Sequence, residues 1–208
     1  MLKKMELEDP DICIAPRNLE KPTLEAVQEE VELNYVEKVV PDVGLVLNLH
    51  QIHSIEGGVI FPGDGSAHYH VSFSVIVFRP ERGQILSGTL VHSDEHGVRV
   101  SMKFFDDIFV PKSALQEPSS FDEAERLWVW DFEDNHAYME LEEEVRFRVT
   151  SVRYPEAPRS PDAARVLTPL QGGTARGAFA PMLVVAEMND AGLGCVSWWG
   201  EGDEGEGG

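Results

Sequence analysis

The sequence predicts an α+β protein in two modules: one helix on a small antiparallel sheet, followed by an all-β barrel of the OB type. Three observations indicate this. An apolar stripe at helical spacing follows the start signal Pro22-Thr23. Apolar residues alternate over 71–78, which is typical of a long strand with one buried face. Several short, closely spaced strand patterns follow Gly83.

The first module, residues 1–80, begins with a short strand around Cys13. We expect it at a sheet edge, because Lys3, Lys4 and Pro10 disfavour a long central strand. The helix is expected from Thr23, as its N-cap, to about Pro41. Its apolar stripe consists of Leu24, Val27, Val31 and Tyr35.

Two glycine-rich turns divide the rest of this module. A strand is expected over 43–49, followed by a turn at Gly57-Gly58 and a short strand over 59–61. A second turn over 62–65 then leads into the long strand that ends before Pro80. The module therefore reads strand, helix, strand, short strand and long strand.

The second module, residues 81–199, contains the expected barrel. Strands are predicted at 85–92, 97–102, 108–110, 128–132, 138–141 and 145–154, and 121–126 is expected to form only a helical turn. A closing hairpin is expected from 182–188 and 194–199, with Trp198 and Trp199 anchoring it to the barrel. Residues 155–180, rich in Pro, Gly, Ala and Ser, predict a flexible insertion, and 200–208 predict a disordered acidic tail.

The formal net charge of -20 limits the partners of the chain. Residues 1–80 carry 6 Lys/Arg against 13 Asp/Glu, and residues 81–208 carry 11 against 24, so the acidity is not confined to the tail. Such a chain repels phosphate at long range, which excludes strong non-specific nucleic-acid binding by the chain alone. The chain could still bind single-stranded nucleic acid by stacking, or lie beside a basic partner protein.

The two cysteines, Cys13 and Cys195, are too few for a disulfide framework or a cysteine zinc site and suit a reducing compartment. Apolar runs stay far below the ~18 residues of a membrane span, and no signal-peptide core follows the first residues. We therefore expect a soluble intracellular protein with no membrane partner.

Histidines are the first candidates for metal binding. His50 and His53 form an H-x-x-H pair, and His68 and His70 form an H-x-H pair that shares one face of a strand. H-x-x-H on a strand points its members to opposite faces, and we expect no cysteine nearby. We therefore expect surface or packing histidines, and neither a metal nor a cofactor.

No catalytic set is indicated. Asp64, Ser66 and His68 are close in sequence, but they lack a nucleophile elbow. The G-x-G at Gly63 and Gly65 is not followed by a helix, so glycine is needed there for a turn and not for a phosphate.

Bases and aromatics gather beside the second barrel strand, the usual stacking platform of an OB fold. They are Arg99, Lys103, Phe104 and Phe105. One interpretation is contact with single-stranded RNA by these four residues. The other is that Phe104 or Phe105 closes the barrel core, and the alternation suggests that at least one does.

The chain resembles the larger stalk subunit of nuclear and archaeal RNA polymerases, and most of all the RNA polymerase III version. The segments that carry the resemblance are KVVPDVGLVLNLHQI, VIFPGDGSAHYHVSFSVIVFRP, GQILSGTL, GVRVSMKFFDDIFVP, FDEAERLWVWDFE, EEVRFRV and GLGCVSWW. They are long, ordered and spaced through most of residues 16–199. GVRVSMKFFDDIFVP and LGCVSWW favour the polymerase III version over its polymerase II counterpart.

The resemblance implies a ribonucleoprotein-like N-terminal domain and an S1-type OB domain. It implies a non-catalytic nuclear subunit in a heterodimer with a small helical stalk subunit, acting in initiation with initiation factors. The barrel would approach nascent RNA at the exit path and bind it weakly. Docking on the polymerase III core would use Gly57, Gly58, Phe61, Pro62, Gly63, Asp64 and Gly65.

Two alternatives from other classes stay open on the residues alone. One is a free-standing S1-domain protein that binds single-stranded RNA, which would need no partner. The other is a metal-dependent hydrolase, which elemental analysis would detect.

Overall fold

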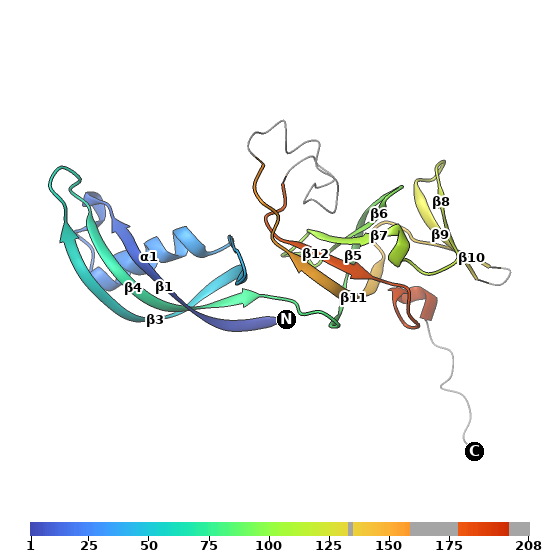
Figure 1. Ribbon diagram of the computed structural model, residues 1–208, viewed down its shortest axis with the longest axis horizontal. Coiled ribbons are helices and arrows are strands. Elements are labelled where there is room, and N and C mark those ends of the chain that lie inside the picture. Colours follow the sequence, from blue (N-terminus) through green and yellow to red (C-terminus); the bar gives the residue numbers. More distant parts are fainter. Residues whose placement is uncertain (133–134, 159–178, 200–208) are drawn as a thin grey trace, which may run out of the picture. The chain divides into compact units, whose positions relative to one another are not determined.

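The computed structural model describes residues 1–132, 135–158 and 179–199 and divides the chain into two compact units, Met1–Arg79 and Pro80–Gly208 (Figure 1). The predicted α+β class is confirmed, with a single helix on a sheet in the first unit and a barrel in the second. Most of the expected insertion and all of the expected tail lie outside the described residues. Among the described residues, no helix is long and apolar enough to cross a membrane.

The first unit is a four-stranded antiparallel sheet in the order β1-β4-β3-β2. Its strands are β1 (Leu2–Ile14), β2 (Val39–Val40), β3 (Gly44–Ile60) and β4 (Ala67–Phe78). After a short 3-10 turn, η1 (Pro16–Asn18), the helix α1 (Thr23–Tyr35) lies across one face of the sheet (Figure 1). The helix contacts β1 and β3.

The core of this unit follows from the alternation along β4. Val71, Phe73, Val75 and Val77 are fully buried and pack with Val27 and Val31 of α1. Valine and phenylalanine suit this position, because branched and aromatic side chains pack well on a pleated surface. The prediction of one long strand with a strongly buried face is confirmed.

The edge position of β1 is confirmed, but the strand is longer than expected. It pairs with β4 from Leu2 to Ile14, with an irregularity between Asp9 and Ile12. Pro10 lies within that irregularity, where a missing N–H interrupts no regular ladder. An edge strand tolerates the lysines and the proline that argued for a shorter element.

Helix α1 begins at Thr23, so the predicted N-cap is wrong by one residue. Pro22 holds the cap position and no side chain caps the helix. Val27 and Val31 lie in the core as expected, whereas Leu24 is exposed and Ala26 is buried.

Gly57 and Gly58 do not form the expected turn. β3 continues through them to Ile60, and its pairing with β4 shifts at this point, between Gly57 and Val59. Both glycines have positive φ, +97° and +83° respectively. A left-handed backbone at glycine gives a bulge inside a strand as readily as a turn between strands. The turn before β4 is present as predicted, centred on residues 62–64.

The second unit is built on a closed five-stranded barrel. Its strands are β5 (Ile85–Asp94), β6 (Gly97–Ser101), β7 (Ile108–Pro111), β11 (Glu144–Arg153) and β12 (Leu183–Glu187). The sheet order is β12-β7-β6-β5-β11-β13, and the pairing of β12 with β11 closes the barrel. β12 runs parallel to β7, and the other pairings are antiparallel. This order is that of an OB fold.

A second, smaller sheet follows the 3-10 turn η2 (Lys112–Ala114). Its strands β8 (Ser119–Asp122), β9 (Leu127–Phe132) and β10 (Asn135–Tyr138) form an antiparallel sheet. The expected helical turn over 121–126 is therefore wrong, because its first residues belong to β8.

The expected closing hairpin is also wrong. β13 (Gly194–Cys195) pairs with β11 and not with β12. After it, η4 (Val196–Trp199) places Trp198 against Trp130 of β9, with ring centroids 5.0 Å apart. These tryptophans therefore join the C-terminal segment to the smaller sheet.

Candidate functional site

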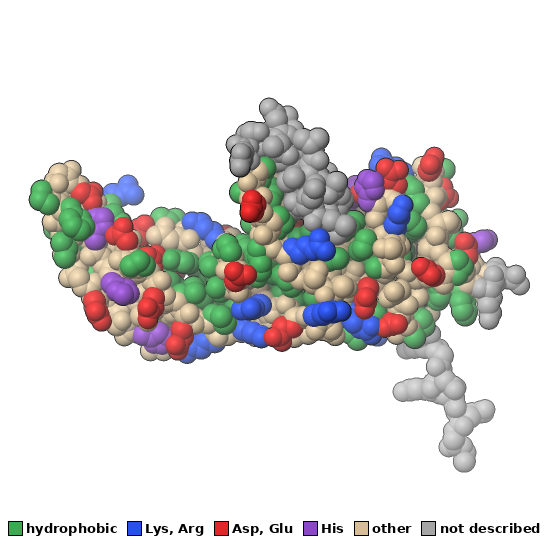
Figure 2. Space-filling view, viewed as in Figure 1, with side chains coloured by type: hydrophobic (Ala, Val, Ile, Leu, Met, Phe, Trp, Pro, Cys, Tyr) green, Lys and Arg blue, Asp and Glu red, His purple; other side chains and the backbone are tan. Residues whose placement is uncertain are grey.

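The end of β3, the turn and the start of β4 project from the first unit, and residues 57–68 are called the tip here. Val59, Ile60 and Phe61 are exposed by 54%, 56% and 54%. Figure 2 shows hydrophobic side chains at the end of the first unit that carries this turn. Three consecutive exposed apolar side chains make the tip a candidate interaction site, because contiguous apolar surface on a protein is often functional.

The turn of the tip depends on backbone conformations that glycine adopts freely. Gly63 has φ +91° and Gly65 has φ +79°. The backbone N–H of Asp64 donates to the carbonyl of Phe61 at 3.2 Å. The turn therefore has a defined shape, which presents the apolar residues before it.

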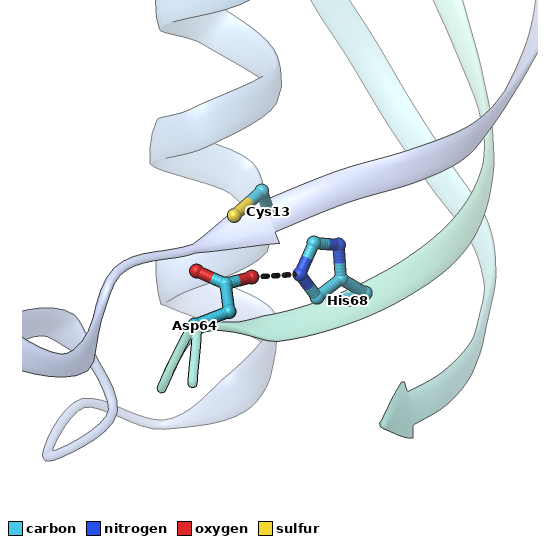
Figure 3. A group of neighbouring side chains, drawn as sticks. All are labelled: Cys13, Asp64 and His68. Atoms are coloured by element: carbon cyan, nitrogen blue, oxygen red, sulfur yellow. Dashed lines mark hydrogen bonds and ion pairs between the residues drawn. The ribbon is translucent and has the colours of Figure 1, made fainter. Parts of the chain in front are cut away.

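His68 ties the turn to β1. Its Nδ1 lies 2.6 Å from Asp11 Oδ1. Its Nε2 lies 2.6 Å from Asp64 Oδ2, the contact that Figure 3 marks with a dashed line. The hydrogen bonds to Asp11 and Asp64 raise the pKa of His68, and the hydrogen bond from His68 lowers the pKa of Asp64. The imidazolium form can donate to both carboxylates at once. We call Asp11, Asp64 and His68 the histidine clasp.

Cys13 lies beside this clasp. It is paired with His68 across β1 and β4, and its Sγ, an oxygen of Asp64 and a ring nitrogen of His68 all lie within 4.8 Å of one another. Figure 3 shows the three side chains pointing toward one another. The expectation that no cysteine lies near the H-x-H pair is therefore wrong, because β1 brings Cys13 from far away in the sequence.

The other histidines do not join this group. His70 is exposed and pairs with Glu56, and His50 and His53 are exposed on β3. Within the part of the chain that the structure describes, the only group of three potential ligands is Cys13, Asp64 and His68.

The residues predicted to contact RNA do not share one surface. Arg99 is only 5% exposed, and its guanidinium lies 5.5 Å from the ring centroid of Phe109. Burial lowers the pKa of Arg99. Phe105 is buried as well, which confirms that one of the two phenylalanines lies in the interior. Neither side chain offers a face to a base. The predicted RNA-binding role of Arg99 and Phe105 is therefore replaced by a structural role inside the second unit.

Lys103 and Phe104 stay exposed in the loop after β6. Phe104 is 44% exposed, and Lys103 has a left-handed backbone with φ +70°. An exposed aromatic ring beside a lysine is the minimal arrangement for stacking one base near one phosphate. The candidate RNA surface is thus reduced from four residues to two.

Comparison with known proteins identifies the family of the chain. Residues 84–199 match the family described as RNA polymerase III subunit Rpc25, and residues 11–65 match the SHS2 domain found in the N terminus of Rpb7p and Rpc25p. The chain belongs to the Rpc25 family of RNA polymerase III subunits. The resemblance stated from the sequence is confirmed.

Relatives of the Rpc25 family match over nearly the whole chain. The RNA polymerase III subunit rpc8 of Schizosaccharomyces pombe is 37% identical over 194 residues, which cover 90% of this chain and 95% of the relative. The RPC8 subunit of Bos taurus is 37% identical over 196 residues, with 90% and 94% covered. The polymerase II subunit RPB7 of Saccharomyces cerevisiae is 34% identical over only 67 residues, covering 32% of this chain and 39% of the relative. The polymerase III family is therefore favoured over its polymerase II counterpart.

Sequence reasoning named the turn of this Rpc25 family member but missed the residues around it. Val59 and Ile60 were expected only as a short strand, and Asp11 and Cys13 had no expected role. One signal was available, since three apolar residues in a row cannot all face one side of a sheet. Asp11 and Cys13 carried no signal, because they come from β1 and their position beside His68 is set by the register of β1 and β4.

Proposed function

We propose that this chain is a non-catalytic stalk subunit of RNA polymerase III, paired with a small helical stalk subunit and docked on the polymerase core near the RNA exit path. Membership of the Rpc25 family supports the polymerase III complex and, with it, a nuclear location. In this proposal the subunit supports initiation together with initiation factors. The free-standing RNA-binding protein is less well supported, because the full-length relatives are named as polymerase subunits.

The exposed apolar tip is the observation that carries the docking proposal. Val59, Ile60 and Phe61 stand next to a turn whose shape is set by Gly63 and Gly65. Burying one such side chain in a complex contributes about 1.5–3 kcal/mol at full burial. Gly57, Gly58, Pro62 and Asp64 shape or flank this surface, so all seven residues predicted for docking lie in one tip.

The first unit also offers apolar surface for the small stalk partner. Leu24 and Leu33 of α1 are exposed, although they belong to the helix that covers the sheet. A shallow hollow beside Leu24 is also lined by Leu49 and Ile52 of β3. A helical partner would cover these residues, and we expect the full chain expressed alone to aggregate and co-expression with the partner to prevent this.

The docking proposal is tested by two matched substitutions. Ile60→Asp places a charge on the tip, and Ile85→Asp places the same charge on an equally exposed isoleucine of the second unit, since both are 56% exposed. We expect Ile60→Asp to weaken capture of the polymerase III core at least tenfold and Ile85→Asp to leave it unchanged. Capture by the tagged heterodimer, quantified against increasing salt, gives the measurement. Equal capture by both variants would refute docking through the tip.

RNA contact is the secondary part of the proposal. Lys103 and Phe104 provide one charge and one ring, and the net charge of the chain opposes phosphate. We therefore propose weak, stacking-dominated contact with single-stranded nascent RNA. The RNA contact is separable from docking, because Lys103 and Phe104 lie in the second unit.

A further inference from the structure

Three potential metal ligands of different chemistry meet where β1, the turn and β4 come together. Cys13 and His68 are direct partners in the β1–β4 ladder, and such cross-strand neighbours have Cβ atoms about 4.5–5.5 Å apart. Their side chains alternate with those of Ile12 and Ile14, which pack with α1, so they lie on the sheet face away from the helix. Asp64 reaches the same place from the turn, four residues before His68.

The spacing of the ligand atoms suits a tetrahedral ion after a small rearrangement. The sulfur, oxygen and nitrogen atoms lie within 4.8 Å of one another. Ligand atoms bound at about 2.0–2.3 Å around zinc are roughly 3.2–3.8 Å apart. The widest separation must shrink by up to about 1 Å, whereas His68 Nε2 and Asp64 Oδ2, now 2.6 Å apart, must separate by about 0.6 Å. The Asp64 carboxylate is exposed and stands in a surface turn, which leaves room for both movements.

The second ring nitrogen of His68 provides an independent observation. Asp11 holds Nδ1 at 2.6 Å, which directs Nε2 toward Asp64 and Cys13. Metal-binding histidines almost always donate their other N–H to a carboxylate or a carbonyl, which fixes the ring and raises its basicity. The Asp11–His68 pair already has this arrangement.

We propose that the tip binds one divalent ion of the zinc class through Cys13 Sγ, Asp64 and His68 Nε2, with Asp11 as the orienting carboxylate. On binding, the metal replaces the Nε2 proton and the thiol proton, and both protons pass to solvent. A water molecule completes the tetrahedral set. The mixed sulfur, nitrogen and oxygen donors favour Zn²⁺ over Ca²⁺ and Mg²⁺, which take oxygen ligands.

Among the described residues, the other neighbours that pack on His68 are uncharged. On β3 its partner is Val59, and the ring of Phe61 lies edge-on at 5.0 Å. The charged groups that face it are therefore Asp11 and Asp64. A bound metal would join the turn covalently to β1 and limit the motion of the apolar residues beside it. This inference does not depend on what the tip docks against.

The competing explanation is the histidine clasp alone, in which His68 as imidazolium bridges the two carboxylates and no metal binds. Cys13 has no role in that case. The two explanations differ in the thiol. Titration of the metal-free heterodimer with Co²⁺, a spectroscopic substitute for zinc, gives a thiolate-to-cobalt charge-transfer absorption only where a sulfur binds the ion.

We expect this absorption to saturate at a single equivalent of Co²⁺ and to disappear on addition of Zn²⁺. Cys13→Ser should abolish it, and Asp11→Asn, which leaves all three ligands in place, should weaken Co²⁺ binding by about 10–100-fold. His70→Gln is the control, an exposed histidine two residues away on the same strand, and should change nothing.

A second readout follows the thiol directly. Zn²⁺ should slow alkylation of Cys13 in the wild type, and less so in Asp11→Asn at the same metal concentration. Absence of the charge-transfer absorption, with a rate of Cys13 alkylation that does not depend on metal, would overturn the proposal. The histidine clasp without a metal would then be the explanation. An absorption that survives Cys13→Ser would overturn it as well, because the ion would then be bound through another thiol.

Discussion

Replacing Gly63 by valine tests whether the shape of the turn matters for docking. Gly63 has φ +91°, and a Cβ atom built there meets nothing within 4 Å. The substitution therefore introduces backbone strain without a steric clash. The left-handed region costs an L-residue about 1–2 kcal/mol, and a β-branched residue falls at the upper end. We expect the turn of the unbound variant to adopt another conformation, in which valine is not strained.

The size of the effect follows from that strain. If docking requires the native turn, the variant must regain that conformation when it binds. The strain of 1–2 kcal/mol or so then lowers the affinity for the core by about 5–30-fold. The core of the first unit lies away from the turn, so the heterodimer should still form. Binding of the purified heterodimer to immobilised polymerase core measures the affinity, and thermal unfolding of the same sample checks the fold.

Gly192→Val serves as the control for this experiment. Gly192 also has positive φ, +79°, with nothing within 4 Å of its Cβ position, but it belongs to the second unit. It should show similar strain and unchanged core binding. Native affinity in Gly63→Val, or an equal loss in Gly192→Val, would refute the reasoning.

Three further outcomes are expected. Phe104→Ala should remove most of the weak binding of the heterodimer to single-stranded RNA, since stacking is worth roughly 1–3 kcal/mol per base. Phe105→Ala should instead destabilise the barrel by about 3–5 kcal/mol. Fluorescence anisotropy measures RNA binding and thermal unfolding measures stability, so together they distinguish the two effects. RNA binding that survives Phe104→Ala would place the RNA surface elsewhere. Burial, followed by a hydrogen bond with Glu143, raises the pKa of the Cys195 thiol, so the folded chain keeps this proton to higher pH than the unfolded chain. That stabilisation is complete below the ordinary thiol pKa of about 8.5 and is lost as the pH rises above it, so the free energy of unfolding should fall more steeply above that pH in the wild type than in Cys195→Ala. Equal slopes in urea unfolding between pH 7 and 10 or so would contradict this.

The parts of the fold that sequence reasoning predicted are those with strong local periodicity. The alternation through Val71, Phe73 and Val75 predicted β4 because a half-buried strand requires it. β8 was missed because its four residues, Ser119–Asp122, carry almost no apolar alternation. Gly57 and Gly58 were assigned to a turn because positive φ is needed in turns and in bulges alike, and only the pairing partner distinguishes the two.

The candidate site was predictable only where its residues are contiguous. The turn at Gly63 and Gly65 was recognised from its composition. The cluster of Cys13 with His68 depends on the register of two strands more than fifty residues apart in the chain, and a shift by one residue would put them on opposite faces. Arg99 was taken for a surface residue because charge favours exposure, whereas in the structure it packs against Phe109 inside the second unit.

The order of the barrel strands has a consequence during synthesis. β11 ends at Arg153, and β12, which pairs with both β7 and β11, begins only at Leu183. At about 5–20 residues per second, the ribosome needs roughly 1.5–6 s to make the residues between them. During that time β7 and β11 each present an unpaired edge, the kind of surface on which chains associate. A chain that terminates before Leu183 would keep both edges for its lifetime, although its first unit already contains every strand it needs.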